Sequence, residues 1–197
     1  MDHPCVFLIG RHGSGKTSIG HALEAGHGWK HISLGDLGRL ARKNQRPQEH
    51  SLRLMVALSR HRPGEPLAGA LVQAILADIE RIRSTQCLSV DGFPSEAAHL
   101  ALLTAGSCII LVDATDETRE TRLARRAELT NRQWTPGMAS ARDLALPDLI
   151  QAAASAGVLS VVSNTGDLAA AVAAVLDIAG QKKPPCDGWL FVTRPRG

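Results

Sequence analysis

Eight residues near the start of the chain, Gly10 to Thr17, match the pattern G-x-x-x-x-G-K-[ST] at every fixed position. The glycines of this stretch let the backbone adopt conformations closed to other residues, so that successive N–H groups can face one anion. In such a loop Lys16 contacts the β- and γ-phosphates of a nucleotide, and the Thr17 hydroxyl is placed to bind Mg²⁺. The stretch therefore predicts a phosphate-binding loop for ATP. Its predicted nucleotide-binding residues are Gly13, Ser14, Gly15, Lys16, Thr17 and Ser18.

A second chemical group follows an apolar run later in the chain. Residues 87–90 have the composition of a buried strand, and Asp91-Gly92-Phe93-Pro94 comes directly after them. A carboxylate at the carboxyl end of a core strand is the expected second contributor to a Mg²⁺ site in a protein with this loop. We therefore predict that Thr17 and Asp91 bind Mg²⁺ together. An ordinary turn aspartate is the other interpretation.

Arginines are concentrated in the stretch that follows residue 118. Arg122 and Arg126 are four residues apart, so they share one face of the expected helix, and Arg132 and Arg142 come after it. A run of arginines on a helix is usually a solvated face. Residues 130–140 contain Asn, Pro and Gly and are expected to form a loop or a small flap.

The elements that must position these residues alternate along the chain. Strands are expected at residues 5–9, around 31–32, and at 87–90, 108–112 and 158–162. Helices are expected at 16–25, 36–44 with Asp36 as the cap, 50–59, 66–83 with Pro66 in the first position, 95–103, 116–128, 144–156 and 168–179. This alternation predicts an α/β fold with a parallel sheet that is covered by helices on both faces.

The composition fits one globular domain. The 197 residues are 44% hydrophobic, 21% charged and only 3% aromatic, so the core is expected to consist of Ala, Leu, Ile and Val. A formal charge of +3 does not favour a nucleic-acid partner. No membrane span or signal peptide is expected. The four cysteines include no C-x-x-C pair, which is typical of a reduced cytoplasmic protein, and we expect a monomer.

Four ordered motifs give residues 5–179 a resemblance to the adenylate kinases and their nucleoside monophosphate kinase relatives. They are the loop, the run His-Ile-Ser-Leu-Gly-Asp-Leu-Gly-Arg at 31–39, residues 91–94, and the arginines followed by 164–166 (Asn-Thr-Gly). The resemblance implies a three-layer P-loop sandwich with a five-stranded parallel sheet. The composition separates a domain (1–180) from a tail (181–197), of which residues 189–192 could dock as a strand. Within the domain the resemblance implies a small helical acceptor-binding arm at about 34–65 and a short lid at about 127–141, which has no cysteines and hence no zinc.

The resemblance also implies roles for single residues. Arg39 resembles the arm arginine that holds the acceptor phosphate, and Arg122 resembles the residue that packs against the donor adenine. Asn164 and Gly166 would lie against the donor base. The catalytic residues implied are Lys16 and the arginines around the transferring phosphoryl group, Arg126, Arg132 and Arg142. The acceptor-binding residues implied are Leu34, Arg39, Gly92, Phe93, Ser95 and His99.

Three acceptor-side positions depart from the family. Leu34 stands where the family usually has Thr, Ser95 where it has Arg, and His99 where it has Gln. The family uses that Thr and Gln to recognise the adenine of AMP and that Arg to hold its phosphate. We therefore expect poor activity with AMP. The sequence Gly-Lys-Thr at the end of the loop is more similar to shikimate and gluconate kinases, although the paired aspartates of shikimate kinases are missing.

The resulting hypothesis is an enzyme that transfers the γ-phosphoryl group of ATP to a nucleoside monophosphate with Mg²⁺. Such a reaction depends mainly on positioning and charge neutralisation, and an ionised acceptor phosphate needs no general base. Two alternatives stay open. One is a regulatory module that binds ATP without catalysis, and the other is a small-molecule kinase of the shikimate or gluconate kinase type.

Overall fold

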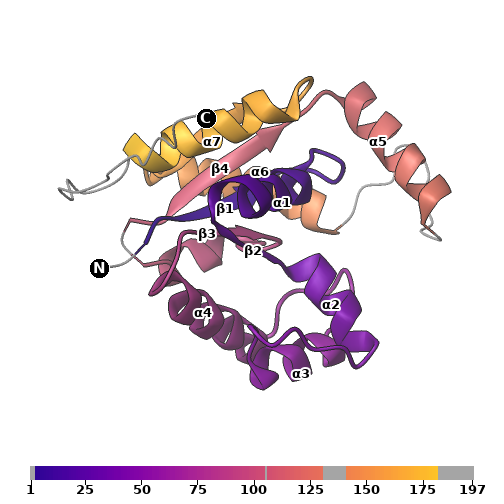
Figure 1. The fold of residues 1–197 in the computed structure, drawn as a ribbon, viewed down its shortest axis with the longest axis vertical. Helices are drawn as coiled ribbons and strands as arrows, with labels where there is room; N and C mark the ends of the chain where they lie inside the picture. Colours follow the sequence, from indigo (N-terminus) through magenta and orange to yellow (C-terminus); the bar gives the residue numbers. More distant parts are fainter. Residues whose placement is uncertain (1–2, 105, 131–140, 182–197) are drawn as a thin grey trace, which may run out of the picture.

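Five parallel strands form the centre of the molecule (Figure 1). The computed structural model describes residues 3–104, 106–130 and 141–181. The strand order is β2-β3-β1-β4-β5, and every neighbouring pair is parallel. The strands are β1 (Cys5–Ile9), β2 (Lys30–Ser33), β3 (Leu88–Asp91), β4 (Cys108–Asp113) and β5 (Leu159–Ser163). The predicted five-stranded parallel sheet is confirmed.

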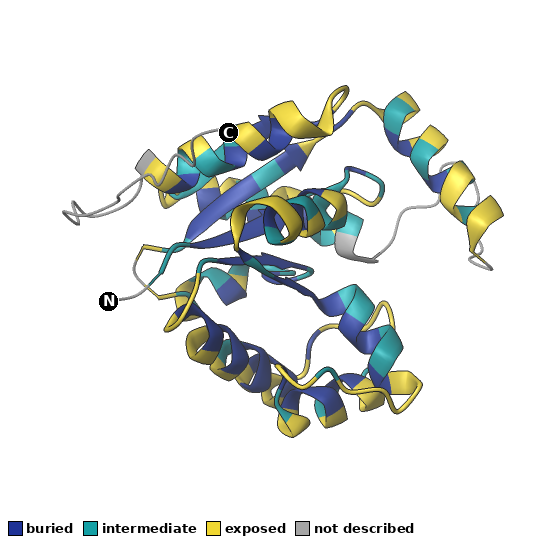
Figure 2. Ribbon diagram, viewed as in Figure 1, coloured by how far each residue is buried: buried dark blue, intermediate teal, exposed yellow. Residues whose placement is uncertain are grey.

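Helices cover both faces of this sheet. On one face, α1 (Lys16–His27) and α7 (Leu168–Gln181) pack on Val6 and Leu8 of β1. On the other face, α4 (Gly69–Arg83), α6 (Ala141–Ser155) and the 3₁₀ helix η1 (Ala97–Leu102) pack around Phe7 and Ile9. Figure 2 shows the buried residues gathered in the strands and on the inner sides of the helices. The predicted three layers are therefore present.

Three further helices lie outside the two layers that cover the sheet. α2 (Leu34–Arg42) and α3 (Leu52–Arg60) follow β2 and form a separate helical group with part of α4 (Figure 1). They fall within residues 34–65, and their assignment as an acceptor-binding arm stays a prediction. α5 (Asp116–Leu129) projects away from the sheet after β4. The expected lid lies largely, and the tail almost entirely, outside the described residues.

Several element boundaries differ from those expected. Ser33, and not Asp36, caps α2, because β2 runs on to Ser33 and its hydroxyl accepts the Asp36 N–H at 3.4 Å. Pro66 does not begin α4, because Ala68 is extended and brings Leu67 into the core before the helix starts. The short helix expected at 95–103 is a 3₁₀ helix, and α6 begins three residues earlier than expected.

Within the described part of the chain, no helix is long and apolar enough to cross a membrane. Among the described residues Cys5, Cys87 and Cys108 form no disulfide bond, and Cys5 and Cys108 are buried in the sheet. Burial raises the pKa of the Cys5 thiol to about 12, so this side chain stays neutral and acts as a small apolar group.

A glycine lets α1 approach β2 closely. A Cβ atom on Gly20 would lie 2.1 Å from Cε1 of the His31 ring. The ring is buried, and its Nδ1 is 2.9 Å from Ser89 Oγ, so it is held in place from the sheet side. The absence of a side chain at Gly20 thus allows the helix that follows the phosphate loop to pack on β2.

We predict that Gly20→Ala lowers the free energy of unfolding by about 1–3 kcal/mol, because the added methyl group would overlap a fixed ring. Gly26→Ala is the matched control in the same helix, since nothing lies within 4 Å of a Cβ atom there. It should leave stability unchanged or raise it by up to about 1 kcal/mol. Urea unfolding of both variants measures the change in the free energy of unfolding. Equal changes in the two variants would show that the close approach at Gly20 does not contribute to stability.

Candidate active site

A cavity of about 550 Å³ opens at the carboxyl ends of the central strands. It is lined by the last residues of β1, β2 and β3 and by side chains from the predicted phosphate loop, α2, α5 and α6. The parallel sheet explains this convergence, because the carboxyl ends of its strands meet at one edge. Segments that are far apart in the sequence therefore face a common space.

The loop between β1 and α1 forms the floor of this cavity. Gly13 and Gly15 have positive φ angles of 81° and 94°, which favour glycine. A Cβ atom on Gly15 would lie 2.2 Å from Asn164 Nδ2, so only glycine fits beside that amide. Gly15 caps α1 and has no side chain that could occupy the first N–H groups of the helix. These N–H groups and the helix dipole make the loop a ready anion-binding site.

Lys16 lies across its own loop. Its Nζ donates to the carbonyl oxygens of Gly10 at 2.6 Å and Arg11 at 2.8 Å, and it is 3.3 Å from Ser14 Oγ. The side chain is half-buried and lines the cavity. The amine is thus held at the loop in a position from which it can contact a phosphate.

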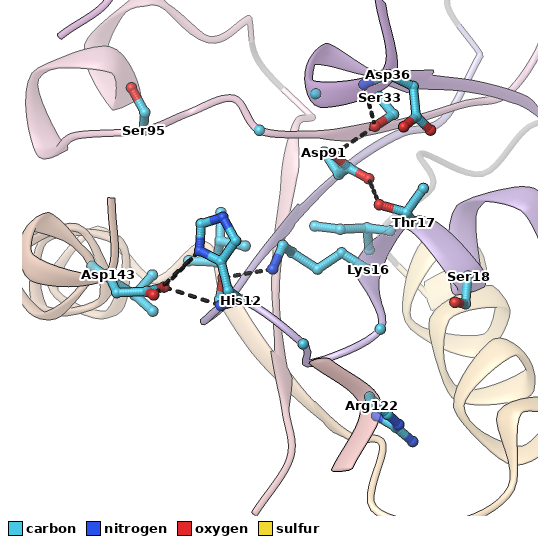
Figure 3. Close-up of a pocket in the computed structure, with 18 of the residues that line it drawn as sticks. His12, Lys16, Thr17, Ser18, Ser33, Asp36, Asp91, Ser95, Arg122 and Asp143 are labelled. Atoms are coloured by element: carbon cyan, nitrogen blue, oxygen red, sulfur yellow. Dashed lines mark hydrogen bonds and ion pairs between the residues drawn. The ribbon is translucent and has the colours of Figure 1, made fainter. Parts of the chain in front are cut away.

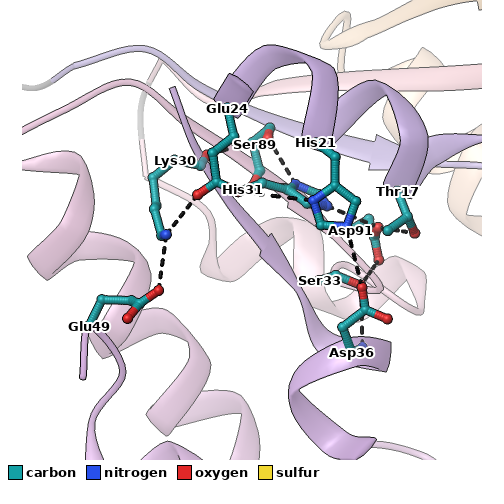
Figure 4. Close-up of polar contacts among 10 residues, drawn as sticks. All are labelled: Thr17, His21, Glu24, Lys30, His31, Ser33, Asp36, Glu49, Ser89 and Asp91. Carbon is teal, nitrogen blue, oxygen red and sulfur yellow. Dashed lines mark hydrogen bonds and ion pairs between the residues drawn. The ribbon is translucent and has the colours of Figure 1, made fainter. Parts of the chain in front are cut away.

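Asp91 is the centre of a set of polar contacts at the edge of the sheet (Figure 4). Thr17 Oγ1 donates to Asp91 Oδ2 at 2.7 Å, and Ser33 Oγ donates to Asp91 Oδ1 at 3.1 Å. His31 Nε2 lies 3.4 Å from Oδ2. Burial by itself raises the pKa of this carboxyl, but His31, the Thr17 hydroxyl and the charge of Lys16 together lower the pKa below its usual value. Asp91 is therefore a buried carboxylate at neutral pH.

The contact between Thr17 and Asp91 fits a Mg²⁺ site. A hydroxyl and an ionised carboxylate are the oxygen ligands that Mg²⁺ takes from proteins, and substrate phosphates and water supply the remainder. Their oxygens are 2.7 Å apart and both residues line the cavity beside Lys16. The donor set agrees with the predicted metal ligands.

Two predicted arginines, Arg122 and Arg126, line the cavity from α5, and Figure 3 shows Arg122 beside the loop. Arg122 Nη1 lies 3.4 Å from the carbonyl oxygen of Ser14, and Arg126 follows one turn later on the same face. Arg132 lies outside the described residues, and Arg142 is placed only as a residue of the first turn of α6.

The residues predicted for the donor base have different surroundings. Asn164 is buried after β5, and its Nδ2 donates to the carbonyl oxygen of Ser14 at 2.8 Å. It therefore holds the backbone of the phosphate loop at Ser14. Gly166 is exposed two residues later. Ser18 lines the cavity from the first turn of α1.

The predicted acceptor residues divide into two groups. Arg39, Gly92 and Ser95 line the cavity, whereas Leu34, Phe93 and His99 are buried and are not among its lining residues. Arg39 pairs with Asp36 one turn before it in α2.

His99 is engaged within its own segment. Its ring packs on Phe93 with a centroid distance of 4.9 Å, and its Nδ1 accepts the Ser95 N–H at 3.3 Å. Its Nε2 is 2.9 Å from Glu96 Oε1. Burial lowers the pKa of the ring, although Glu96 acts in the opposite direction. Both ring nitrogens thus have partners from residues 95–96.

The cavity also holds three charged or titratable side chains that the sequence did not single out as site residues. They are His12, Asp36 and Asp143. His12 occupies a variable position of the loop pattern, and Asp143 follows the predicted Arg142 in sequence. Motif position therefore could have suggested both, but their contact joins residues that are 131 apart in the chain.

Comparison with known proteins connects this geometry to a family. No family model matches the chain. Adenylate kinase isoenzyme 1 of Caenorhabditis elegans is 28% identical over 133 residues, which are 66% of this chain and 62% of that protein. Adenylate kinase 1 of Schistosoma mansoni is 27% identical over 132 residues (64% and 65%), and adenylate kinase isoenzyme 1 of Rattus norvegicus is 27% identical over 131 residues (64% and 66%).

The chain is thus similar to adenylate kinases over about two thirds of its length. It spans somewhat less than two thirds of the length of these curated relatives. A gluconokinase structure from Sinorhizobium meliloti 1021 matches with a TM-score of 0.53 and 19% identity over 90% of this chain and 94% of that chain. This likeness shows that the chain has the fold of a P-loop kinase.

We predict that Asp91→Asn raises the Mg²⁺ concentration required for nucleotide turnover at least about tenfold, because an amide is a weaker metal ligand than a carboxylate. Affinity for metal-free ATP should change much less. Asp113→Asn is a control that removes one exposed carboxylate at the end of β4. A magnesium titration of all three proteins makes the comparison, and unchanged metal dependence in Asp91→Asn would leave Asp91 as a structural turn residue.

Proposed function

We propose that the chain transfers the γ-phosphoryl group of ATP to a nucleoside monophosphate in a Mg²⁺-dependent reaction. One observation carries this proposal: Lys16, the bonded pair of Thr17 and Asp91, and the arginines Arg39 and Arg126 line a single cavity. Phosphoryl transfer needs these parts because it depends on positioning two substrates and neutralising phosphate charge. The adenylate kinase relatives support the same class of reaction.

In this proposal the donor nucleotide occupies the loop side of the cavity. The N–H groups around Gly13 and Gly15 hold its phosphates, and Lys16 exchanges its loop carbonyls for phosphate oxygens. Thr17 and Asp91 would hold Mg²⁺, which supplies charge neutralisation when it is bound. Arg122 and Arg126 approach from α5, where their charge can stabilise the transferring group. Arg132 and Arg142 are proposed for the same role only through the family resemblance.

The acceptor would bind between α2 and the end of β3. Arg39 is the arginine of this side, and Gly92 and Ser95 contribute a backbone turn and a hydroxyl. Among the described lining residues Arg39 is the one arginine on this side, which supports a weakly held acceptor phosphate, since each charge-assisted hydrogen bond contributes about 1.5–3 kcal/mol.

Adenine is a poor fit to this acceptor side. Leu34 is 3% exposed in the core, and His99 directs its ring nitrogens to Ser95 and Glu96. Neither side chain offers a hydrogen bond to a base in the cavity. Discrimination between bases depends on such buried polar groups, so we propose an acceptor other than AMP or a broad, slow specificity.

A second candidate acceptor is a small hydroxylated acid of the kind that gluconate kinases phosphorylate. The observation that favours it is that three polar side chains line the cavity on the side proposed for the acceptor substrate. They are Ser33, Asp36 and Ser95, which could bind hydroxyl groups. The fold likeness to a gluconokinase is compatible with it but shows only the fold.

The test is a panel of acceptors with Mg·ATP, in which ADP formation is followed for nucleoside monophosphates, shikimate and gluconate. We predict that Lys16→Ala reduces turnover at least about 100-fold, because the amine acts mainly on charge that develops in the transition state. Lys43→Ala, at the exposed end of α2, should retain activity. Turnover that is equal in both variants would refute the assignment of Lys16, and nucleotide binding without any turnover would favour a regulatory module.

Restoring the family residues tests the acceptor side. The double variant Ser95→Arg, His99→Gln should raise kcat/KM for AMP about ten- to hundredfold, because it returns a phosphate-binding arginine and a base-reading amide. The gain should be absent for gluconate. If the unaltered protein already uses AMP as its best acceptor, this account of the acceptor side is wrong.

A further inference from the structure

One contact of His12, the third residue of the phosphate loop (Gly10–Thr17), is not explained by the proposed reaction. The His12 N–H donates to Asp143 Oδ1 at 3.0 Å, and the ring Nδ1 lies 3.3 Å from Oδ1 and 3.2 Å from Oδ2 (Figure 3). Both residues line the cavity. The Asp143 side chain is only 9% exposed, whereas the His12 side chain is 47% exposed. The Asp143 carboxylate therefore accepts a hydrogen bond from a backbone N–H of the loop that is proposed to bind the phosphates of ATP.

The carbonyl group of His12 is also held by a hydrogen bond, from α5. The carbonyl oxygen of His12 accepts a hydrogen bond from Arg119 Nε at 2.8 Å. Arg119 is buried and pairs with Asp116 Oδ1 at 2.5 Å, and the same oxygen is 2.6 Å from Arg11 Nη1. These contacts from the first turn of α5 hold the carbonyl side of His12, while its N–H, in the preceding peptide, donates to Asp143.

We propose that the N–H and ring of His12 form a subsite for the γ-phosphate of ATP, which Asp143 occupies in the free protein. A carboxylate oxygen and a phosphate oxygen accept the same two hydrogen bonds. Lys16 contacts the β- and γ-phosphates in loops of this type, and its Nζ donates at 2.8 Å to the carbonyl oxygen of Arg11, the residue before His12. This inference rests on the proposed function.

The two anions cannot share the subsite, because like charges in contact repel and both need the same donors. ATP must therefore displace Asp143, whereas ADP, which lacks the γ-phosphate, need not. Asp143 acts as an internal competitor that lowers the affinity for ATP, and His12 becomes a catalytic residue that contacts the transferring group.

The test compares two nucleotides by calorimetry: Mg·ADP and the Mg²⁺ complex of the non-hydrolysable analogue β,γ-imido-ATP. Asp143→Asn should tighten the analogue about tenfold, equivalent to about 1.4 kcal/mol, and should change ADP affinity less than about twofold. Adding His12→Ala to Asp143→Asn should then weaken the analogue about tenfold and leave ADP unchanged, because only the ring donor is lost.

Two controls accompany these variants. Asp148→Asn removes an exposed carboxylate from the same helix, and His27→Ala removes an exposed imidazole at the end of α1; both should bind like the unaltered protein. Equal effects of Asp143→Asn on the two nucleotides, or no effect on either, would overturn the subsite. Failure of the unaltered protein to bind either nucleotide would instead overturn the proposed function, so the two failures are distinguishable.

Discussion

The hydrogen bond from Thr17 to Asp91 connects the phosphate loop to the third strand, and the geometry of the site depends on it. Asp91 is 6% exposed, and an isolated carboxylate at that depth costs several kcal/mol. Contacts with three residues offset this cost. Thr17 of α1 and Ser33 at the end of β2 donate hydrogen bonds to the carboxylate, and the ring of His31 in β2 lies beside it. The register places Ser33 directly opposite Asp91. Correct pairing of the strands therefore brings the loop hydroxyl and the carboxylate together.

Residues that take no part in the proposed chemistry help to hold Asp91 and the phosphate loop in place. Gly20 leaves room for the His31 ring, and Ser89 orients that ring toward Asp91. Gly15 leaves room for Asn164, which binds the loop carbonyl of Ser14. Each of these contacts fixes one side of the loop or of Asp91. The loop side of the cavity is consequently held by contacts from several elements.

The residues that line the loop side of the cavity could be named from the sequence because their signals are local. The loop pattern, the strand before it and the aspartate after a buried run each occupy a few adjacent residues. Other features depend on tertiary contacts. Ser33 replaces Asp36 as the helix cap because of where β2 ends, and the direction of His99 is set by packing on Phe93 and pairing with Glu96. No local pattern predicts that Asp143 reaches the loop across 131 residues.

The central claim is that phosphate leaves ATP for an acceptor bound in the same cavity. The most direct measurement incubates the protein with Mg²⁺ and ATP labelled at the γ-phosphate, together with each candidate acceptor, and separates the labelled products. The account predicts label in a phosphorylated acceptor at a rate well above its appearance as inorganic phosphate, because an acceptor held beside the γ-phosphate reacts faster than water. Label found only in inorganic phosphate, or remaining in ATP with every acceptor, would contradict it.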